Sequence, residues 1–232
     1  MYSEKFLKFI DMWDKDFGFI RTVEEKVCLD RDGNPIPWYT YPAIEYISQF
    51  DYQDKTVFEF GCGYSSLFWA KRAKKVISIE DNLKWFEKWQ AEFNEPNLDI
   101  RWRDEGKIYE DAIFEENQKY DVIVIDGKRR FECAEAAVQK LSENGMIILD
   151  DSDRINTSTE YQKAVAELKK ANLLQVDFYG FCPMNVYTKT TSVFFRRSFD
   201  FKSKFDVQPV NGYGNLWSLS RKDRKSLFNK LK

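Results

Sequence analysis

The chain has 232 residues, of which 17% are aromatic and 43% hydrophobic, and its formal net charge is −2. This composition predicts a well-packed domain rather than a disordered chain, and the small net charge gives no sign of binding to nucleic acid or to an anionic membrane. The sequence contains no histidine, which excludes Ser-His-Asp and Cys-His nucleophiles, an imidazole base and His-ligated zinc.

The first residues, MYSEKFLKFIDMW, lack the pattern of a signal peptide because acidic residues interrupt the apolar positions. No stretch approaches the roughly 18 apolar residues of a membrane span. The cysteines form no CxxC pair, so free thiols in a reducing compartment are expected. We therefore expect a soluble cytoplasmic protein. The basic tail from Arg221, RKDRKSLFNKLK, is expected to be a solvated helix end, with a membrane or partner contact as the alternative.

Hydrophobic spacing predicts a helix over residues 2–14, a turn-rich loop over 30–37 and a second helix that begins at Pro42. From there, strands alternate with helices. The expected strands are short hydrophobic or β-branched runs at 57–60, 76–80, 100–104, 121–127, 146–151, 173–181 and 192–197. The helices expected between them lie at 65–74, 83–93, 108–114, 131–141 and 157–172.

Two short signals predict helix ends. Asn144-Gly145 is expected to close the helix over 131–141, and Thr157 with Glu160 is expected to form a capping box at the start of the next helix.

The alternation over 57–172 predicts an α/β fold, a doubly wound Rossmann-like sheet that is mainly parallel and has helices on both faces. The last two hydrophobic runs have no helix between them and are expected to form a C-terminal antiparallel strand pair. We expect three parts in the chain: a helical lid or cap over 1–54, the main domain over 55–200 and a C-terminal extension over 201–232.

Ligands of such sheets bind at the carboxyl ends of the strands, where the stretch VFEFGCGYSS places Gly61 and Gly63. Glycine lets the backbone turn sharply and approach a ligand closely. Glu80 ends the next strand, at a suitable interval for a carboxylate that binds both hydroxyls of a ribose. A dinucleotide site requires GxGxxG, but here Ser66 takes the third position. Glu59 would repel a pyrophosphate, whereas it suits an ammonium group.

The loop EFGCGYSS, with Glu80 behind it, closely resembles the first motif of class I S-adenosylmethionine-dependent methyltransferases. The closing strand pair is also similar to that family's extra antiparallel strand. The resemblance implies S-adenosylmethionine as the cofactor and leaves NAD(P) as the minor alternative. The cofactor contacts that it implies come from Glu59, Phe60, Gly61, Cys62, Gly63, Ser65, Glu80, Asp81, Asp104 and Asp126. For Asp104, a place in a surface loop is the alternative.

Three carboxylates follow the fourth and fifth strands, namely Asp126 in IDGKRR and the pair Asp150 and Asp151 in ILDDSDR. They would repel one another unless a cation or protons neutralise them, and oxygen ligands alone favour Mg²⁺ or a similar divalent cation. The arrangement over residues 55–155 resembles macrocin-type metal-dependent sugar O-methyltransferases, with their Asp-Gly and Asp-Asp. In the alternative interpretation, Asp150 binds a backbone amide and Asp151 caps the next turn, without a metal.

The acceptor hydroxyl must lose a proton, and a bound cation would lower its pKa and align it. Without histidine, the candidate catalytic residues are Asp126, Asp150 and Lys128. The run Lys128-Arg129-Arg130 departs from the acidic and aromatic residues of the macrocin type. It forms either a solvated helix start or an attraction for an anionic substrate, with Arg129 as the substrate-binding candidate.

Two aromatic residues, Trp38 and Tyr39, lie between prolines ahead of the main domain. They are candidates for the acceptor pocket, with a place in the core as the alternative. We therefore expect methyl transfer to a small-molecule acceptor, preferably to a hydroxyl, and the sugar-enzyme resemblance favours a saccharide or glycan precursor. The other functions considered are a non-catalytic S-adenosylmethionine-binding module and an NAD(P)-dependent oxidoreductase. Nucleic acid is not expected as a partner, and homo-oligomerisation is left open.

Overall fold

The computed structural model describes residues 2–210, 212–220, 222 and 223. The interpretation of the basic tail depends on Arg221 and on residues beyond 223, so it lies outside the described residues. Within the described part of the chain, no helix is both long and apolar enough to cross a membrane.

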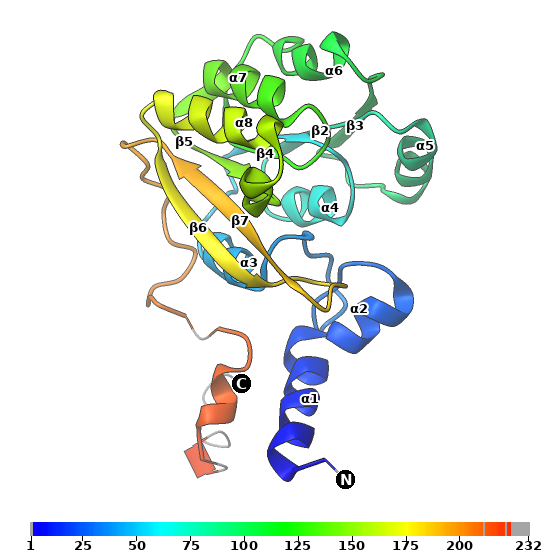
Figure 1. Cartoon of the computed structure of the whole chain (residues 1–232), viewed down its shortest axis with the longest axis vertical. Helices are drawn as coiled ribbons and strands as arrows, with labels where there is room; N and C mark the ends of the chain where they lie inside the picture. Colours follow the sequence, from blue (N-terminus) through cyan, green and yellow to red (C-terminus); the bar gives the residue numbers. More distant parts are fainter. Residues whose placement is uncertain (1, 211, 221, 224–232) are drawn as a thin grey trace.

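A seven-stranded sheet forms the centre of the molecule, in the order β3-β2-β1-β4-β5-β7-β6 (Figure 1). The strands are β1 Thr56–Phe60, β2 Lys75–Glu80, β3 Leu98–Trp102, β4 Tyr120–Ile125, β5 Leu141–Leu149, β6 Leu174–Phe181 and β7 Thr188–Phe195. Strands β1 to β5 pair in parallel, whereas β7 pairs antiparallel with both β5 and β6. The predicted α/β sheet with a closing antiparallel pair is confirmed.

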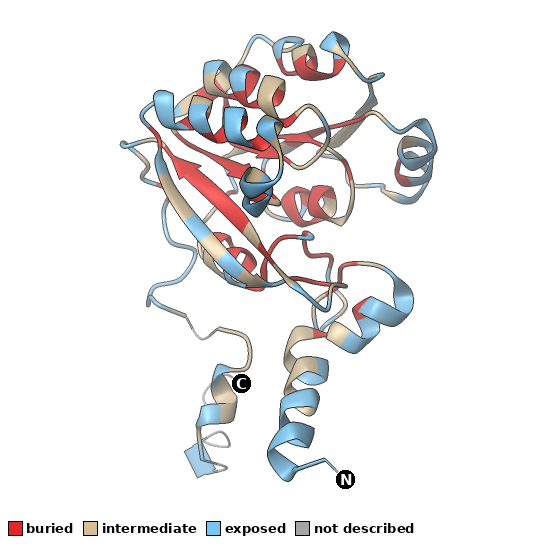
Figure 2. Cartoon of the chain, viewed as in Figure 1, coloured by how far each residue is buried: buried red, intermediate tan, exposed pale blue. Residues whose placement is uncertain are grey.

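Helices lie on both faces of this sheet. The helices of the described residues are α1 Glu4–Phe17, α2 Phe19–Glu25, α3 Tyr41–Ile47, α4 Tyr64–Ala70, α5 Leu83–Glu92, α6 Lys107–Asp111, α7 Arg130–Lys140 and α8 Thr159–Lys170, with 3₁₀ turns η1 Ala112–Phe114, η2 Ser152–Asn156 and η3 Asn215–Ser218. Alternate strand residues enter two hydrophobic clusters. Phe58 and Phe60 pack with residues of α6, α7 and α8, whereas Val57 packs with residues of α3 and α4. Because both faces are covered, the central strands are buried almost throughout (Figure 2).

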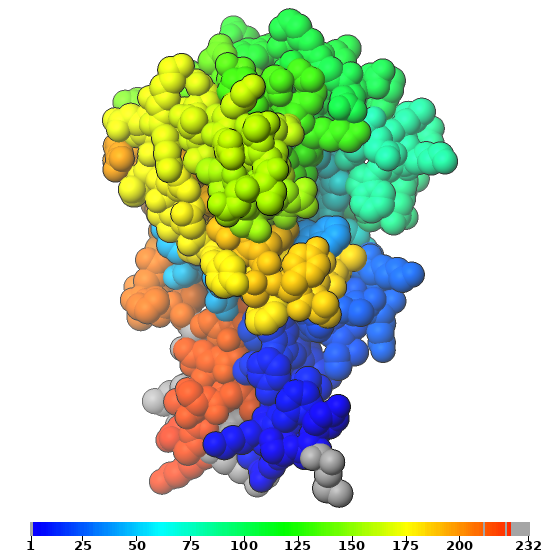
Figure 3. All heavy atoms as spheres, viewed as in Figure 1, coloured from blue at the N-terminus to red at the C-terminus, as the bar shows by residue number. Residues whose placement is uncertain are grey.

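The N-terminal and C-terminal segments lie side by side, away from the sheet (Figures 1 and 3). Helix α1 has no buried residue, and its Trp13 packs against Phe17 and Tyr41. From the C-terminal side, the indole N–H of Trp217 donates a hydrogen bond to Asp16 at 2.7 Å. The two ends of the chain therefore support each other.

The predicted capping box at Thr157 is wrong. Helix α8 has Ser158 at its N-cap, without a side-chain capping bond. Glu160 instead accepts a hydrogen bond from the backbone N–H of Arg130 at 2.5 Å. Arg130 is the first residue of α7, so the carboxylate caps a neighbouring helix rather than its own.

The prediction that Asn144-Gly145 closes a helix is also wrong. Helix α7 ends at Lys140 and β5 begins at the next residue, so Gly145 lies inside the strand. A Cβ at Gly145 would lie 2.7 Å from the carbonyl oxygen of Asp121 and 2.8 Å from Leu141 Cδ1. The glycine is therefore required because β5 approaches the backbone of β4 closely.

We predict that Gly145→Ala lowers the free energy of unfolding by about 1–3 kcal/mol, because the added methyl group overpacks against the β4 backbone. Gly63→Ala is the matched control. Gly63 has an extended φ of 175°, and a Cβ there would meet no atom within 4 Å, so its change should stay below about 1 kcal/mol. Urea denaturation measures both variants, and equal losses would contradict the packing argument.

Candidate active site

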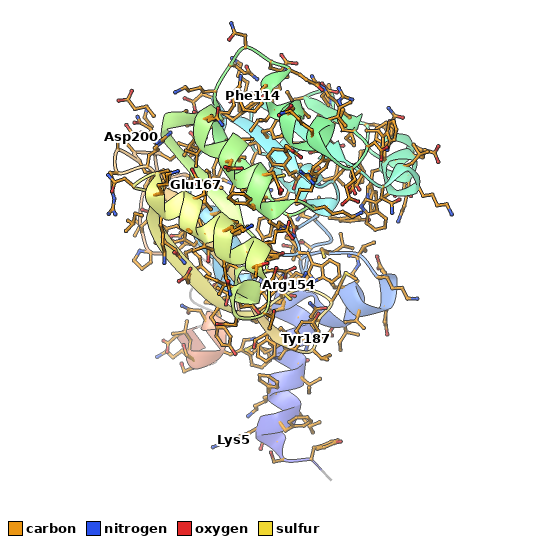
Figure 4. All side chains as sticks on the ribbon, turned by 45° about the horizontal axis from the view of Figure 1, so that its top comes forward. Lys5, Phe114, Arg154, Glu167, Tyr187 and Asp200 are labelled. Atoms are coloured by element: carbon orange, nitrogen blue, oxygen red, sulfur yellow. The ribbon has the colours of Figure 1, made fainter. Side chains whose placement is uncertain are left out.

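A cavity of about 520 Å³ lies at the carboxyl ends of the parallel strands. Its walls come from the N-terminal segment, from the loop after β1 with the start of α5, from the ends of β4 and β5, and from the turn between β6 and β7. Arg154 and Tyr187, which both belong to the wall, are labelled in Figure 4. This is the edge at which open α/β sheets bind their ligands.

The two glycines of the loop after β1 have different roles. Gly61 has a φ of +106°, and a Cβ there would lie 3.2 Å from the backbone of Asp126. This glycine lets the loop pass close to the end of β4. A Cβ at Gly63 would meet no atom within 4 Å, so packing within the protein does not require a glycine there. The open space beside Gly63 leaves room for a ligand close to the backbone.

Glu59 is fully buried at the base of the cavity. Its Oε2 accepts hydrogen bonds from the hydroxyls of Ser66 and Ser78, at 2.5 Å and 2.9 Å. Among the described residues, its Oε1 has no hydrogen-bond partner, although the hydroxyl of Ser65 also lowers the pKa of this carboxyl. Burial raises the pKa of Glu59 to about 7, although the serine hydroxyls oppose the shift. A ligand that donates N–H bonds, above all a cationic one, would satisfy the free oxygen and stabilise the carboxylate.

Glu80 ends β2 and holds two loops in place. Its Oε2 accepts from the backbone N–H of Cys62 at 3.1 Å, and its Oε1 accepts from that of Asn82 at 2.9 Å. Burial raises the pKa of Glu80 to about 7. Trp85, which the sequence analysis did not single out, donates its indole N–H to the carbonyl of Cys62 at 2.7 Å. Glu80 and Trp85 thus hold the glycine loop on both its N–H and its C=O.

Most residues predicted to contact the cofactor line this one cavity: Glu59, Gly61, Cys62, Gly63, Ser65, Glu80, Asp81 and Asp126. Two do not. Phe60 lies in the core, where it packs against Phe58 and Tyr109, because strand alternation turns it to the other face of the sheet. Asp104 is exposed, lies outside the cavity wall and accepts a hydrogen bond from the N–H of Glu105, as in the surface-loop alternative.

The residues predicted to bind substrate are divided. Trp38 lines the cavity. Tyr39 is fully buried in the cluster beneath α3 and α4, as the core alternative proposed. Arg129 lies outside this cavity and forms an ion pair with Glu110 at 2.5 Å. Which of these three side chains reaches the cavity depends on the conformation of the backbone at each residue, which the sequence does not reveal.

Lys128 lines the cavity but does not suit the role of base. Its ammonium forms ion pairs with Asp81 at 2.9 Å and Glu105 at 3.0 Å. Hydrogen bonds to these two carboxylates raise the pKa of Lys128 above its usual value. The amine therefore stays protonated, which argues against Lys128 as a proton acceptor.

The three aspartates are neutralised by side chains of the protein. Asp126 pairs with Arg130 at 3.1 Å. The buried Asp150 contacts the ammonium of Lys189 through Oδ2 and accepts from the hydroxyl of Thr191 at 2.6 Å. Lys189 also pairs with Asp151 at 3.1 Å. Arg130, expected at a solvated helix start or as an attraction for an anionic substrate, is instead 6% exposed.

The structure does not support the interpretation of these aspartates as ligands of a divalent cation. No group of three or more His, Cys, Asp or Glu side chains that could hold a metal ion occurs among the described residues. The structure also differs from the metal-free alternative, in which Asp150 binds a backbone amide and Asp151 caps the next turn. The partners of Asp150 are the Lys189 and Thr191 side chains rather than a backbone amide. Asp151 precedes η2 without a side-chain capping bond.

Lys189 is the main residue that the sequence analysis missed. It lies on β7, two residues before Thr191, so both side chains reach Asp150 from one face of the strand. Burial alone would lower its pKa, but Asp150, Asp126 and Asp151 outweigh burial and hold the pKa of Lys189 above its ordinary value. A buried lysine inside a strand that is paired on both sides is unusual. The sequence analysis expected this strand to begin at 192, so Lys189 fell outside it.

No family model matches the chain, and no curated protein matches it. Several solved structures share its fold. Spermidine synthase from Thermotoga maritima is 16% identical, with a TM-score of 0.52 over 82% of this chain and 72% of that chain. Precorrin-6y C5,15-methyltransferase from Geobacter metallireducens is 13% identical, with a TM-score of 0.51 over 67% and 87%. A candidate O-methyltransferase from Klebsiella pneumoniae is 14% identical, with a TM-score of 0.50 over 61% and 73%. At these identities the likeness concerns the fold.

We predict that Lys189→Met lowers the free energy of unfolding by about 3–5 kcal/mol, because it leaves Asp150 buried without its partner. The double variant Lys189→Met/Asp150→Asn should recover much of this loss. Urea denaturation of the single and double variants measures the coupling.

The control for that cycle is Lys170→Met, which removes an exposed ion pair with Glu167 and should change stability by no more than about 1 kcal/mol. Additive losses for Lys189 and Asp150 would contradict a coupled buried pair.

Proposed function

We propose that this protein is an S-adenosylmethionine-dependent methyltransferase that acts on a small-molecule acceptor, preferably at a hydroxyl. The observation that carries the proposal is the free carboxylate oxygen of Glu59, buried beneath the glycine loop of a Rossmann-like sheet. A pyrophosphate would be repelled there, whereas the ammonium of an amino-acid moiety would supply the missing donors. The closing antiparallel strands and the fold likeness to two methyltransferases support the same conclusion.

The residues of the cavity fit the cofactor part by part. Glu59 would bind the amino group, Glu80 the ribose hydroxyls, and the open space beside Gly63 would admit the ligand next to the backbone. When bound, the sulfonium supplies an electrophilic methyl group. Segment 1–54 would act as the predicted cap, because Lys26 and Trp38 belong to the cavity wall.

Among the candidate catalytic residues, Asp126 is best placed to take a proton from the acceptor. It lines the cavity, and only its Oδ1 pairs with Arg130. Burial raises its pKa, which suits a proton acceptor. A saccharide acceptor remains the finer proposal, which depends on the sequence resemblance to sugar O-methyltransferases. The four buried free cysteines support a cytoplasmic location.

We expect S-adenosylhomocysteine to bind with micromolar affinity in isothermal titration calorimetry. Glu80→Gln should weaken binding by about tenfold or more, or about 1.4 kcal/mol, because it removes the charge that accepts the ribose hydroxyls. Glu87→Gln, which changes an exposed carboxylate on α5, is the control and should bind as the wild type. Binding of NAD(H) without binding of S-adenosylhomocysteine would overturn the proposal.

We also expect the affinity for S-adenosylhomocysteine to rise between pH 6 and 8. In the free protein, Glu59 and Glu80 have pKa values raised to about 7, so both are largely protonated at pH 6. The ammonium and the hydroxyls of the ligand prefer the ionised carboxylates, so binding releases protons below about pH 7.

Titration in buffers of different ionisation enthalpy measures this proton release. Glu59→Gln should bind more weakly and show a smaller change with pH, since only Glu80 then titrates. An affinity that is independent of pH in the wild type would count against Glu59 as the ammonium partner.

A further inference from the structure

The ammonium of Lys189 lies between carboxylates of the fifth strand's end and close to Asp126. It contacts Asp150 and lies 3.1 Å from Asp151 Oδ1, and Asp126 also acts on its pKa. The side chain is 8% exposed, yet it belongs to the cavity wall. A buried ammonium that contacts carboxylates on two neighbouring residues leaves no room for a second cation in the same place.

The charges of this group balance without a metal ion. Asp126, Asp150 and Asp151 carry three negative charges, and Arg130, Lys189 and Arg154 pair with them. A divalent cation would add uncompensated positive charge in a buried region, which is costly. The donor set therefore does not fit a metal ion while Lys189 is present.

Lys189 also keeps binding capacity for a ligand. An ammonium group has three N–H donors, and the described residues supply two carboxylate partners. The aromatic ring of Trp38 lies 5.9 Å from the ammonium nitrogen. The remaining N–H can therefore serve a ligand oxygen in the part of the cavity that Trp38 lines.

We propose that Lys189 replaces a divalent cation in this protein and binds an anionic oxygen of the acceptor. The acceptor part of this proposal rests on the proposed methyltransferase function, whereas the exclusion of a metal ion does not.

The walls around Lys189 indicate the chemical class of that acceptor. Trp38 is 42% exposed and Tyr187 is 62% exposed, and both line the cavity. Such surfaces suit the face of a ring. Lys26, also in the wall, has no ion-pair partner among the described residues and adds positive charge. We infer a ring that carries an oxyanion, which describes both an aromatic acid or phenolate and a sugar acid.

The first experiment is a titration with Mn²⁺ in which electron paramagnetic resonance measures how much of the ion is bound. The wild type should bind no Mn²⁺ up to about 1 mM, whereas Lys189→Met should gain a site, because it frees the carboxylate oxygens. Lys189→Arg keeps the charge and should not gain a site. Wild-type Mn²⁺ binding that Asp150→Asn abolishes would overturn the proposal, as would a Lys189→Met variant that binds no better than the wild type. If Lys189→Met does not fold, the wild type and Asp150→Asn still decide the question.

The second experiment measures anion binding by ligand-observed NMR on protein saturated with S-adenosylhomocysteine. Benzoate and glucuronate are the anionic probes, and benzamide and glucose are their neutral counterparts. The wild type should bind at least one anion and neither neutral probe. Lys189→Met should weaken that binding by about tenfold or more, and Lys189→Arg should restore part of it. The anion that binds identifies the aromatic or the sugar class.

Equal anion binding by the wild type and Lys189→Met, or no anion binding at all, would overturn the acceptor role. Failure of S-adenosylhomocysteine to bind would instead count against the methyltransferase proposal, and the Mn²⁺ titration would still test whether Lys189 excludes a metal ion.

Discussion

The carboxyl edge of the parallel sheet carries buried carboxylates, and holding their charge inside the protein is the constraint on which the site depends. Glu59, Glu80 and Asp150 are each less than 10% exposed. A buried carboxylate is costly unless donors surround it. Each has a different solution: serine hydroxyls for Glu59, backbone N–H groups for Glu80, and an ammonium with a threonine hydroxyl for Asp150.

Two of the groups in the cavity wall, the Glu59 carboxylate and the Lys189 ammonium, keep capacity for a further hydrogen bond. Glu59 leaves one oxygen for which the described residues supply no donor. Lys189 has one more N–H than the carboxylate partners that the described residues supply, and the ring of Trp38 lies 5.9 Å from its ammonium nitrogen. Glu59 and Lys189 both line the cavity, so its wall carries an acceptor group and a donor group. A ligand with an ammonium and a second molecule with an oxyanion would satisfy both groups.

The packing of the sheet keeps this edge in place. Apolar strand residues enter hydrophobic clusters on both faces, so the strand ends cannot shift independently. Gly61 and Gly145 let neighbouring chain segments approach β4 more closely than a side chain would allow. Helix α1 is not held by a hydrophobic core in this way, because it has no buried residue. It relies instead on contacts such as the hydrogen bond from Trp217 to Asp16.

The order and type of the central elements could be predicted from the sequence, because hydrophobic period and turn residues are local properties. The same holds for the glycine loop and Glu80, whose spacing within one strand–helix–strand unit suffices to bring them together. Helix ends were less predictable. Glu160 caps α7 rather than its own helix. A local sequence motif cannot reveal a contact between two helices that are distant in the chain.

Long-range strand pairing decided the chemistry of the aspartates. From the sequence, Asp126, Asp150 and Asp151 were three like charges, and a divalent cation was a reasonable inference. Two of their partners are local, since Arg130 lies four residues after Asp126 and Arg154 lies three after Asp151. Lys189 lies 39 residues from Asp150 along the chain, and it reaches Asp150 only because β7 folds back antiparallel beside β5. Sequence by itself determined which charges the strand ends carry. Only the tertiary structure decided what neutralises the buried Asp150, because that depends on which strands become neighbours.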